Sequence, residues 1–211
     1  MKYKAVAFDY NGTLVDDWKL MFEVILCHIA AGLGVPPTVV EYLRTFEPPY
    51  VEYIRKCGSM IPESRNWSIW DELSTEFQIE PHQGAEELLR FLTWHGIPCY
   101  VITANQRVRV NEGLIQHGLK RYFRALISDD ERKEAGIRKV LEEHKLHPSE
   151  MIYIGDMRVD MQAAKATGVV GVGIGSVKGH ESEHCEILRE AGATHAFRSM
   201  SAFHNALMNG L

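Results

Sequence analysis

The stretch FDYNGTLVDD, residues 8–17, joins a short apolar run to an acidic turn that contains a glycine. The apolar run, residues 5–8, is typical of a buried strand, and Asp9 directly follows it. A carboxylate in this position could attack a phosphate. Two residues further on stands Asn11, where a proton-exchanging side chain would assist the attack, and an amide neither gives up nor takes a proton at ordinary pH.

Further short apolar runs recur to the end of the chain, at residues 98–102, 125–127, 151–154, 169–174 and, more weakly, 194–197. Helical patterns separate the later runs, at residues 84–95, 106–117, 138–144 and 161–167. Continuous apolar strands that alternate with helices are typical of a parallel sheet covered on both faces. The sequence therefore predicts a doubly wound, Rossmann-like α/β fold.

One segment, residues 15–82, interrupts this alternation and contains no convincing strand. Apolar side chains recur at three- and four-residue spacing from Trp18 to Leu33, which predicts an amphipathic helix, and later prolines punctuate further helices. We therefore expect an α/β core of residues 1–14 and 83–211, with an all-helical cap of residues 15–82 inserted after the first strand. The alternative is a plain structural insert.

Polar side chains follow four of the predicted strands, and they comprise three carboxylates, an amide, a hydroxyl and an ammonium: Asp9, Asn11, Thr103, Lys133, Asp156 and Asp160. In open α/β sheets, ligands bind beyond the carboxyl ends of the strands. We therefore expect these side chains to meet at one edge of the sheet and to form the functional site.

These motifs together resemble the haloacid dehalogenase superfamily of aspartate-nucleophile hydrolases, and more narrowly its phosphoglycolate-phosphatase-like members with a helical cap. Residues 8–17 resemble the first family motif, and VITAN (101–105) resembles the second. Lys133 stands where the lysine of the third motif belongs, although Glu134 replaces the proline that follows it in the family. IGDMRVDMQAAKATG (154–168) resembles the fourth motif.

The resemblance implies a Mg²⁺-dependent phosphatase that acts on a small phosphorylated metabolite through an aspartyl-phosphate. It implies Asp9 as the nucleophile and as a metal ligand, together with Asp156 and the backbone carbonyl of Asn11. Asp160 completes the implied metal site through a water. Such a site suits Mg²⁺, which prefers a few carboxylates together with phosphate oxygens and water.

The remaining family roles fall on side chains around these acids. Thr103 would hydrogen-bond the transferring phosphoryl group, and Lys133 would neutralise charge on Asp9 and on the phosphate. By the same resemblance, the substrate would contact the two motif turns, at Gly12, Thr13, Ala104 and Asn105.

Asn11 departs from the family's phosphatases, which carry an aspartate there that protonates the leaving alcohol and then activates water. General acid–base assistance contributes typically about 10²–10⁴ in rate. We therefore expect a slow phosphatase that is less impaired on substrates with acidic leaving groups.

Several alternatives to this reading stay open. Asp16 or Asp17 could supply the missing carboxylate, and deamidation of Asn11 before Gly12 could restore an aspartate. A catalytically weak relative could bind a phosphorylated ligand or partner for regulation. Less favoured is hydrolysis of a carbon–phosphorus bond, which would use a lysine of the insertion as a Schiff base.

Composition excludes other classes of function. The formal net charge is −5 with no basic block, which argues against a nucleic-acid-binding surface. No run of 18 apolar residues is present, so no membrane span is expected. The four cysteines are scattered, as in a reducing compartment, and we expect a cytoplasmic monomer or homodimer.

One further motif, HESEH at residues 180–184, matches the HExxH pattern of zinc proteases. The glycines at residues 173–179 indicate a loop directly before it. We therefore expect a loop followed by a helix that packs on the sheet through Leu188, and no zinc site.

Overall fold

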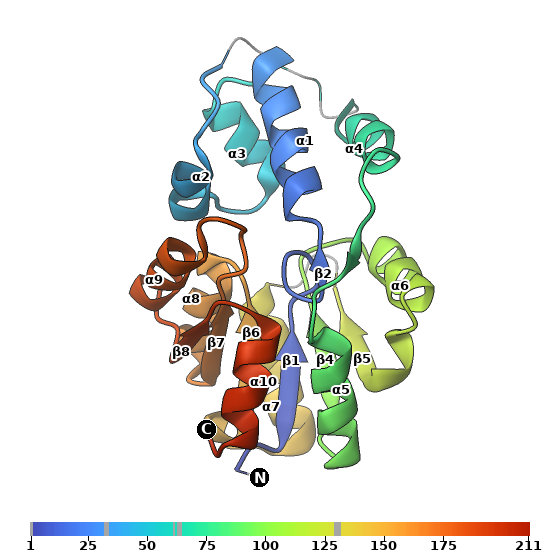
Figure 1. Ribbon diagram of the computed structural model, residues 1–211, viewed down its shortest axis with the longest axis vertical. Coiled ribbons are helices and arrows are strands. Elements are labelled where there is room, and N and C mark those ends of the chain that lie inside the picture. Colours follow the sequence, from blue (N-terminus) through green and yellow to red (C-terminus); the bar gives the residue numbers. More distant parts are fainter. Residues whose placement is uncertain (1, 32–33, 61, 63–64, 129–131) are drawn as a thin grey trace. The chain divides into compact units, whose positions relative to one another are not determined.

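The computed structural model describes residues 2–31, 34–60, 62, 65–128 and 132–211. The chain forms two compact units, one of Met1–Val15 with Pro81–Leu211 and one of Asp16–Glu80 (Figure 1). From the sequence we expect a core of residues 1–14 and 83–211 and a cap of residues 15–82, and these domain limits stay a prediction.

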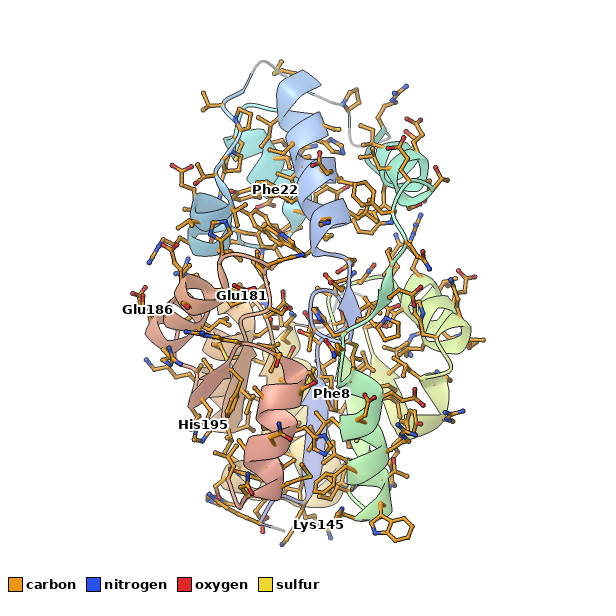
Figure 2. The ribbon with its side chains drawn as sticks, viewed as in Figure 1. Phe8, Phe22, Lys145, Glu181, Glu186 and His195 are labelled. Atoms are coloured by element: carbon orange, nitrogen blue, oxygen red, sulfur yellow. The ribbon has the colours of Figure 1, made fainter. Side chains whose placement is uncertain are left out.

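The first unit is built on a six-stranded sheet in the order β5-β4-β1-β6-β7-β8. Every neighbouring pair runs parallel. The strands are β1 (Ala5–Phe8), β4 (Cys99–Ile102), β5 (Phe123–Ile127), β6 (Met151–Gly155), β7 (Val170–Ile174) and β8 (His195–Phe197). All four residues of β1 are buried, as its apolar sequence predicts. Figure 2 shows Phe8 well inside this unit.

Helices cover both faces of the sheet, with α7 and α8 behind it and α5 and α10 in front of it (Figure 1). The helices of this unit are α5 (Ala85–Trp94), α6 (Arg107–Gln116), α7 (Lys133–His144), α8 (Arg158–Thr167), α9 (Glu181–Glu190) and α10 (Met200–Met208). Short 3-10 turns, η2 (Lys120–Tyr122) and η3 (Pro148–Glu150), lead into β5 and β6. The predicted α/β fold with a parallel sheet is confirmed.

Two of these helices begin earlier than the sequence pattern indicates. We expect helices over residues 138–144 and 161–167, but α7 begins at Lys133 and α8 at Arg158. Their first turns carry polar residues, which hide the apolar period. In α8 the Asp160 carboxylate accepts the Met157 N–H at 2.9 Å, and this bond satisfies a free amide at the helix start.

Gly136 lets α7 approach the sheet closely. A Cβ atom at this position would lie 2.7 Å from Cγ2 of Ile102 and 3.1 Å from Cγ2 of Ile127. Ile102 is the last residue of β4, and Lys133 lies one helical turn before Gly136. The close approach therefore brings the start of α7, with its lysine, near the carboxyl ends of the strands.

The second unit is helical, with α1 (Trp18–Ala31), α2 (Val39–Thr45), α3 (Tyr50–Lys56) and α4 (Asn66–Ser74). An aromatic cluster joins α1 to α2, and the ring centroids of Phe22 and Tyr42 in it are 5.9 Å apart. Figure 2 labels Phe22 in this unit. Leu20, Val24 and Ile69 form a second core cluster, against which Trp70 and Phe77 pack. The expected helical insert is thus present, and its first helix begins at Trp18.

Two short strands correct the expectation that residues 15–82 contain none. The strands β2 (Val15–Asp16) and β3 (Glu80–Pro81) pair with each other as a two-stranded sheet. Each strand has two residues, too few to leave a period in the sequence.

The chain shows no helix, within the ranges that the structure describes, that is long and apolar enough to cross a membrane.

His28 is buried inside the helical unit. Its side chain is fully shielded from solvent, and neither ring nitrogen has a hydrogen-bond partner among the described residues. The ring lies edge-on to Tyr50, with 6.2 Å between centroids. Burial lowers the pKa of His28 below its ordinary value of 6.5, so the neutral form is favoured.

We predict that Gly136→Ala destabilises the protein by about 1–3 kcal/mol, the usual cost of overpacking a core. The higher helix propensity of alanine returns at most about 1 kcal/mol. Denaturant unfolding measures the change, with Glu142→Ala on the exposed side of α7 as the control. An unchanged or higher stability would show that α7 does not pack as described.

We predict that His28→Leu makes the protein less sensitive to acid. With the folded pKa depressed, the unfolded chain takes up a proton first, so stability present above about pH 6.5 is lost as the pH falls. The loss from one such group approaches about 1.4 kcal/mol per pH unit. Free energies of unfolding at pH 7.5 and 5.5 test this.

The matched control is Ile25→Val, which trims the same buried unit without removing a titratable group. It should lower the free energy of unfolding equally at both pH values. An equal acid sensitivity of wild type and His28→Leu would contradict a buried neutral imidazole.

Candidate active site

The site lies at the carboxyl end of β1, the strand that runs between β4 and β6. Asp9 directly follows β1, and its amide donates to the carbonyl oxygen of Ile154 at 2.8 Å. Thr103 and Asp156 directly follow the two flanking strands. All three side chains are buried. Parallel pairing thus brings together residues that are far apart in the sequence.

Lys133, at the start of α7, links two of the carboxylates. Its Nζ donates to Asp9 Oδ2 at 2.9 Å and also to Asp160 Oδ1. Burial by itself would lower the pKa of Lys133, but the Asp160 and Asp9 carboxylates outweigh it and raise the pKa. The ammonium is therefore charged and fixed between two acids.

Asp160 is held by protein donors at both oxygens. Besides Lys133, its Oδ1 accepts the hydroxyl of Tyr153 at 3.0 Å, and its Oδ2 accepts the Met157 N–H at 2.9 Å. The side chain is fully buried. These bonds direct the carboxylate toward the lysine.

Asp156 is fixed from two sides. Thr13 Oγ1 donates to its Oδ1 at 2.7 Å, and His184 Nε2 donates to its backbone oxygen at 2.6 Å. Burial, followed by the neighbouring Asp160 and Asp9 carboxylates, raises the pKa of Asp156 well above its usual range. Gly12 adopts φ +67°, and a Cβ there would lie 2.1 Å from Asp156 Oδ2, so glycine is required in this turn.

The acids fit a divalent cation. Ligand oxygens of Asp9, Asp156 and Asp160 lie within 4.8 Å of one another. Asp9 Oδ1 is buried and has no hydrogen-bond partner among the described residues. When all three carboxylates are ionised, one ammonium leaves uncompensated negative charge, and burial together with this charge raises the pKa of Asp156. A hard cation with a preference for oxygen would neutralise that charge, and Mg²⁺ is such a cation.

Asn11 is paired with a second amide. Asn105 Nδ2 donates to Asn11 Oδ1 at 2.9 Å, while Asn105 Oδ1 accepts the Gln106 N–H at 2.7 Å. The backbone bond at Gln106 fixes which end of Asn105 faces Asn11. Asn11 therefore uses its oxygen as an acceptor, and a carboxylate at position 11 would accept the same hydrogen bond.

The other predicted contacts lie around this centre. Thr103 Oγ1 accepts the amide of Asn105 at 3.3 Å, and Thr13 bonds Asp156 as described. Ala104, by contrast, is exposed in the turn after β4. Hydrogen bonds thus tie Thr13, Thr103 and Asn105 to the residues around the acids. The substrate contacts stay a prediction, at Gly12, Thr13, Ala104 and Asn105.

The HESEH stretch forms no metal site among the described residues, where the three aspartates are the one group suited to an ion. The helix α9 begins at Glu181, so His180 precedes it and His184 lies inside it. Burial lowers the pKa of His184 to about 4, so the ring is neutral. His184 bonds the backbone oxygen of Asp156 and does not belong to the group of acids suited to an ion. The expected helix is present, and Leu188 is buried.

The sequence does not predict three of the hydrogen-bond partners of these acids. They are Tyr153, which bonds Asp160, and Thr13 and His184, which bond Asp156. The sequence pattern indicates only that Tyr153 is a buried strand residue. A buried tyrosine hydroxyl requires a hydrogen-bond partner, and this requirement is a weak sign of its contact with Asp160. The links of Thr13 and His184 span 143 and 28 residues and leave no local pattern.

Comparison with known proteins agrees with the geometry. Residues 6–174 match the family described as haloacid dehalogenase-like hydrolase. A 5'-nucleotidase of Pseudomonas aeruginosa is 26% identical, over 98% of this chain and 96% of that protein. A phosphoglycolate phosphatase of Neisseria meningitidis is 27% identical, over 81% of this chain and 80% of that protein.

The fold is shared with solved structures. A conserved haloacid dehalogenase-like protein of unknown function from Agrobacterium tumefaciens superposes with a TM-score of 0.77 at 18% identity, over 98% of each chain. The motifs, the sheet order and the match over most of the chain agree. The chain belongs to the haloacid dehalogenase-like hydrolase family.

Proposed function

We propose that this hydrolase is a Mg²⁺-dependent phosphatase that acts on a small phosphorylated metabolite through a phosphorylated Asp9. The observation that carries the proposal is the state of the Asp9 carboxylate. One oxygen is held by Lys133 at 2.9 Å, and the other is buried without a partner beside Asp156. The similarity to named phosphatases and nucleotidases supports the class of substrate.

Asp9 must be ionised to act as a nucleophile. Burial raises its pKa, the charge of Lys133 lowers it, and the charge of Asp160 raises it again. Lys133 therefore favours the reactive form in a site that otherwise opposes it. Mg²⁺, when bound by Asp9 and Asp156, supplies further positive charge to the acids and the phosphate.

Hydrolysis would take place in two steps. A carboxylate oxygen of Asp9 forms a bond to phosphorus while the bond to the leaving group breaks. Water then attacks the same phosphorus, the bond to Asp9 breaks, and phosphate leaves. Thr103 and Lys133 would hold phosphoryl oxygens and offset their charge during both steps.

Asn11 limits the choice of substrate. The leaving oxygen requires a proton unless it is stable as an anion, and the amide of Asn11 has no proton to transfer. We therefore propose that substrates with acidic leaving groups, such as aryl phosphates and acyl phosphates, react faster than alkyl phosphates. The second step lacks a base at the same position and should also be slow.

The second candidate is a catalytically weak protein that binds a phosphorylated ligand or partner. The Asn11–Asn105 hydrogen bond favours it, because both side chains are amides and neither exchanges protons. Hydrolysis of a carbon–phosphorus bond remains an untested alternative. It would require Lys19 or Lys56 as a Schiff base, and borohydride reduction with substrate would attach a covalent adduct to that lysine.

We predict that Asn11→Asp raises kcat on an alkyl phosphate such as phosphoglycolate by about 10²–10⁴, the usual gain from acid–base assistance. On nitrophenyl phosphate, the rate of phosphoryl transfer to Asp9 should rise much less, since the nitrophenolate leaving group needs no proton. Steady-state and pre-steady-state assays on both substrates measure this.

The matched control is Asn111→Asp, which makes the same change of charge where the side chain contacts Lys120 on the surface. It should leave both rates unchanged. If Asn11→Asp were no faster than wild type on the alkyl phosphate, the proposed reason for slow turnover would be wrong, and the binding function would be favoured.

We predict that chelation of divalent cations abolishes turnover and that Mg²⁺ restores it. Because a bound ion stabilises the native state, Mg²⁺ should also raise the Tm of the wild type without any substrate. Asp156→Asn should remove most of that Tm shift. Full activity in chelator, together with a Tm that does not respond to Mg²⁺, would refute the metal site.

A further inference from the structure

Tyr153 places a hydroxyl in the interior of the sheet. The residue lies in β6, is fully buried, and packs in the core cluster between the sheet and α7 and α8. Its hydroxyl lies 3.0 Å from Asp160 Oδ1 and 3.2 Å from the backbone oxygen of Ile102. Burying a hydroxyl in an apolar layer is costly unless it is hydrogen-bonded, and these two acceptors offset that cost.

The two acceptors connect Tyr153 to both sides of the site. Asp160 Oδ1 is the oxygen that also accepts Lys133. Ile102 is the residue directly before Thr103. The phenol of Tyr153 on β6 thus contacts the Asp160 carboxylate, which accepts the Lys133 ammonium. It also contacts the end of β4, directly before the Thr103 hydroxyl.

Lys133 requires such support because its side chain is long and flexible. An ammonium on a four-carbon stem has several rotamers of similar energy, and its position depends on the groups that it contacts. Asp160 is one of its two partners. The Met157 N–H fixes one oxygen of Asp160, and the Tyr153 hydroxyl fixes the other, so the carboxylate plane is held at both ends.

We propose that Tyr153 is a positioning residue that, through Asp160, holds Lys133 against Asp9. The inference deepens the proposed function, because it assumes that Lys133 acts on Asp9 during phosphoryl transfer. Tyr153 acts on Asp9 only indirectly, through Asp160 and Lys133. Its contribution is to the geometry of the nucleophile and its ammonium.

The chain provides a matched control in Tyr100. It lies on β4, is 1% exposed, and belongs to the same core cluster as Tyr153. Its hydroxyl bonds Nε2 of His144, at the far end of α7 from Lys133. Tyr100→Phe therefore removes one buried hydroxyl from the same layer without disturbing the site, and it reports the purely structural cost.

The first experiment compares Tyr153→Phe and Tyr100→Phe on nitrophenyl phosphate with saturating Mg²⁺. We expect kcat to fall roughly 10- to 100-fold in Tyr153→Phe with little change in KM, because a small misplacement of reacting groups is costly in rate. Tyr100→Phe should stay within about two-fold of wild type. Combined with Lys133→Met, Tyr153→Phe should add no further loss, since both changes remove the same interaction.

The second experiment needs no turnover. Lys133 is acetylated with acetic anhydride in metal-free protein, and its modification rate is followed by peptide mass spectrometry. Loosening of the Asp160 contact should raise that rate several-fold in Tyr153→Phe but not in Tyr100→Phe. Thermal unfolding of both variants shows whether their stability losses are comparable.

The outcomes separate the two proposals. Absence of turnover in wild type would refute the proposed function, whereas the Lys133 labelling would still test the positioning. Faster labelling in Tyr153→Phe alone, or a kcat loss absent from the double variant with Lys133→Met, supports the inference. Equal labelling rates and equal kcat in the two tyrosine variants would overturn it, and so would multiplicative kcat losses with Lys133→Met.

Discussion

The arrangement of this site depends on one electrostatic constraint, the crowding of three buried carboxylates around a single ammonium. Oxygens of Asp9, Asp156 and Asp160 lie within 4.8 Å of one another. Like charges at such distances in a buried site repel strongly, and burial adds a desolvation cost for each. Lys133 neutralises part of that charge through ion pairs with Asp9 and Asp160. In the proposed function, a divalent cation neutralises the remaining charge and Asp9 acts as the nucleophile.

The fold supplies the close approaches that this crowding requires. The strand β1 lies between β4 and β6, so residues that follow three neighbouring strands meet at one edge. Glycines allow the final contacts. A Cβ at Gly155 would lie 2.3 Å from Cγ of Asp160, and one at Gly12 would lie 2.1 Å from Asp156 Oδ2. Gly136 gives α7, and so Lys133, its proximity to the sheet. These close approaches at glycines thus determine how near the acidic side chains and Lys133 lie to one another.

Much of this could be predicted from the sequence, because polar residues directly after apolar strands must meet at the sheet edge. That rule predicts Asp9, Thr103 and Asp156 at this edge, whereas Lys133, at the start of α7, follows from motif resemblance alone. The helix starts at Lys133 and Arg158 could not be predicted, since their first turns are polar and lack the apolar period. The partners also escape prediction, because the Asn105–Asn11 and Tyr153–Asp160 bonds depend on side-chain geometry in three dimensions.

The proposed function requires a side-chain oxygen of Asp9 to become bonded to phosphorus. The most direct measurement is to mix enzyme, Mg²⁺ and acetyl phosphate or nitrophenyl phosphate, quench in acid, and reduce with borohydride, which converts an aspartyl-phosphate to homoserine. Peptide mass spectrometry then locates the reduced residue. We predict homoserine at position 9, which accumulates because Asn11 slows hydrolysis of the aspartyl-phosphate. Turnover without reduction at Asp9, or with reduction at another carboxylate, would contradict it.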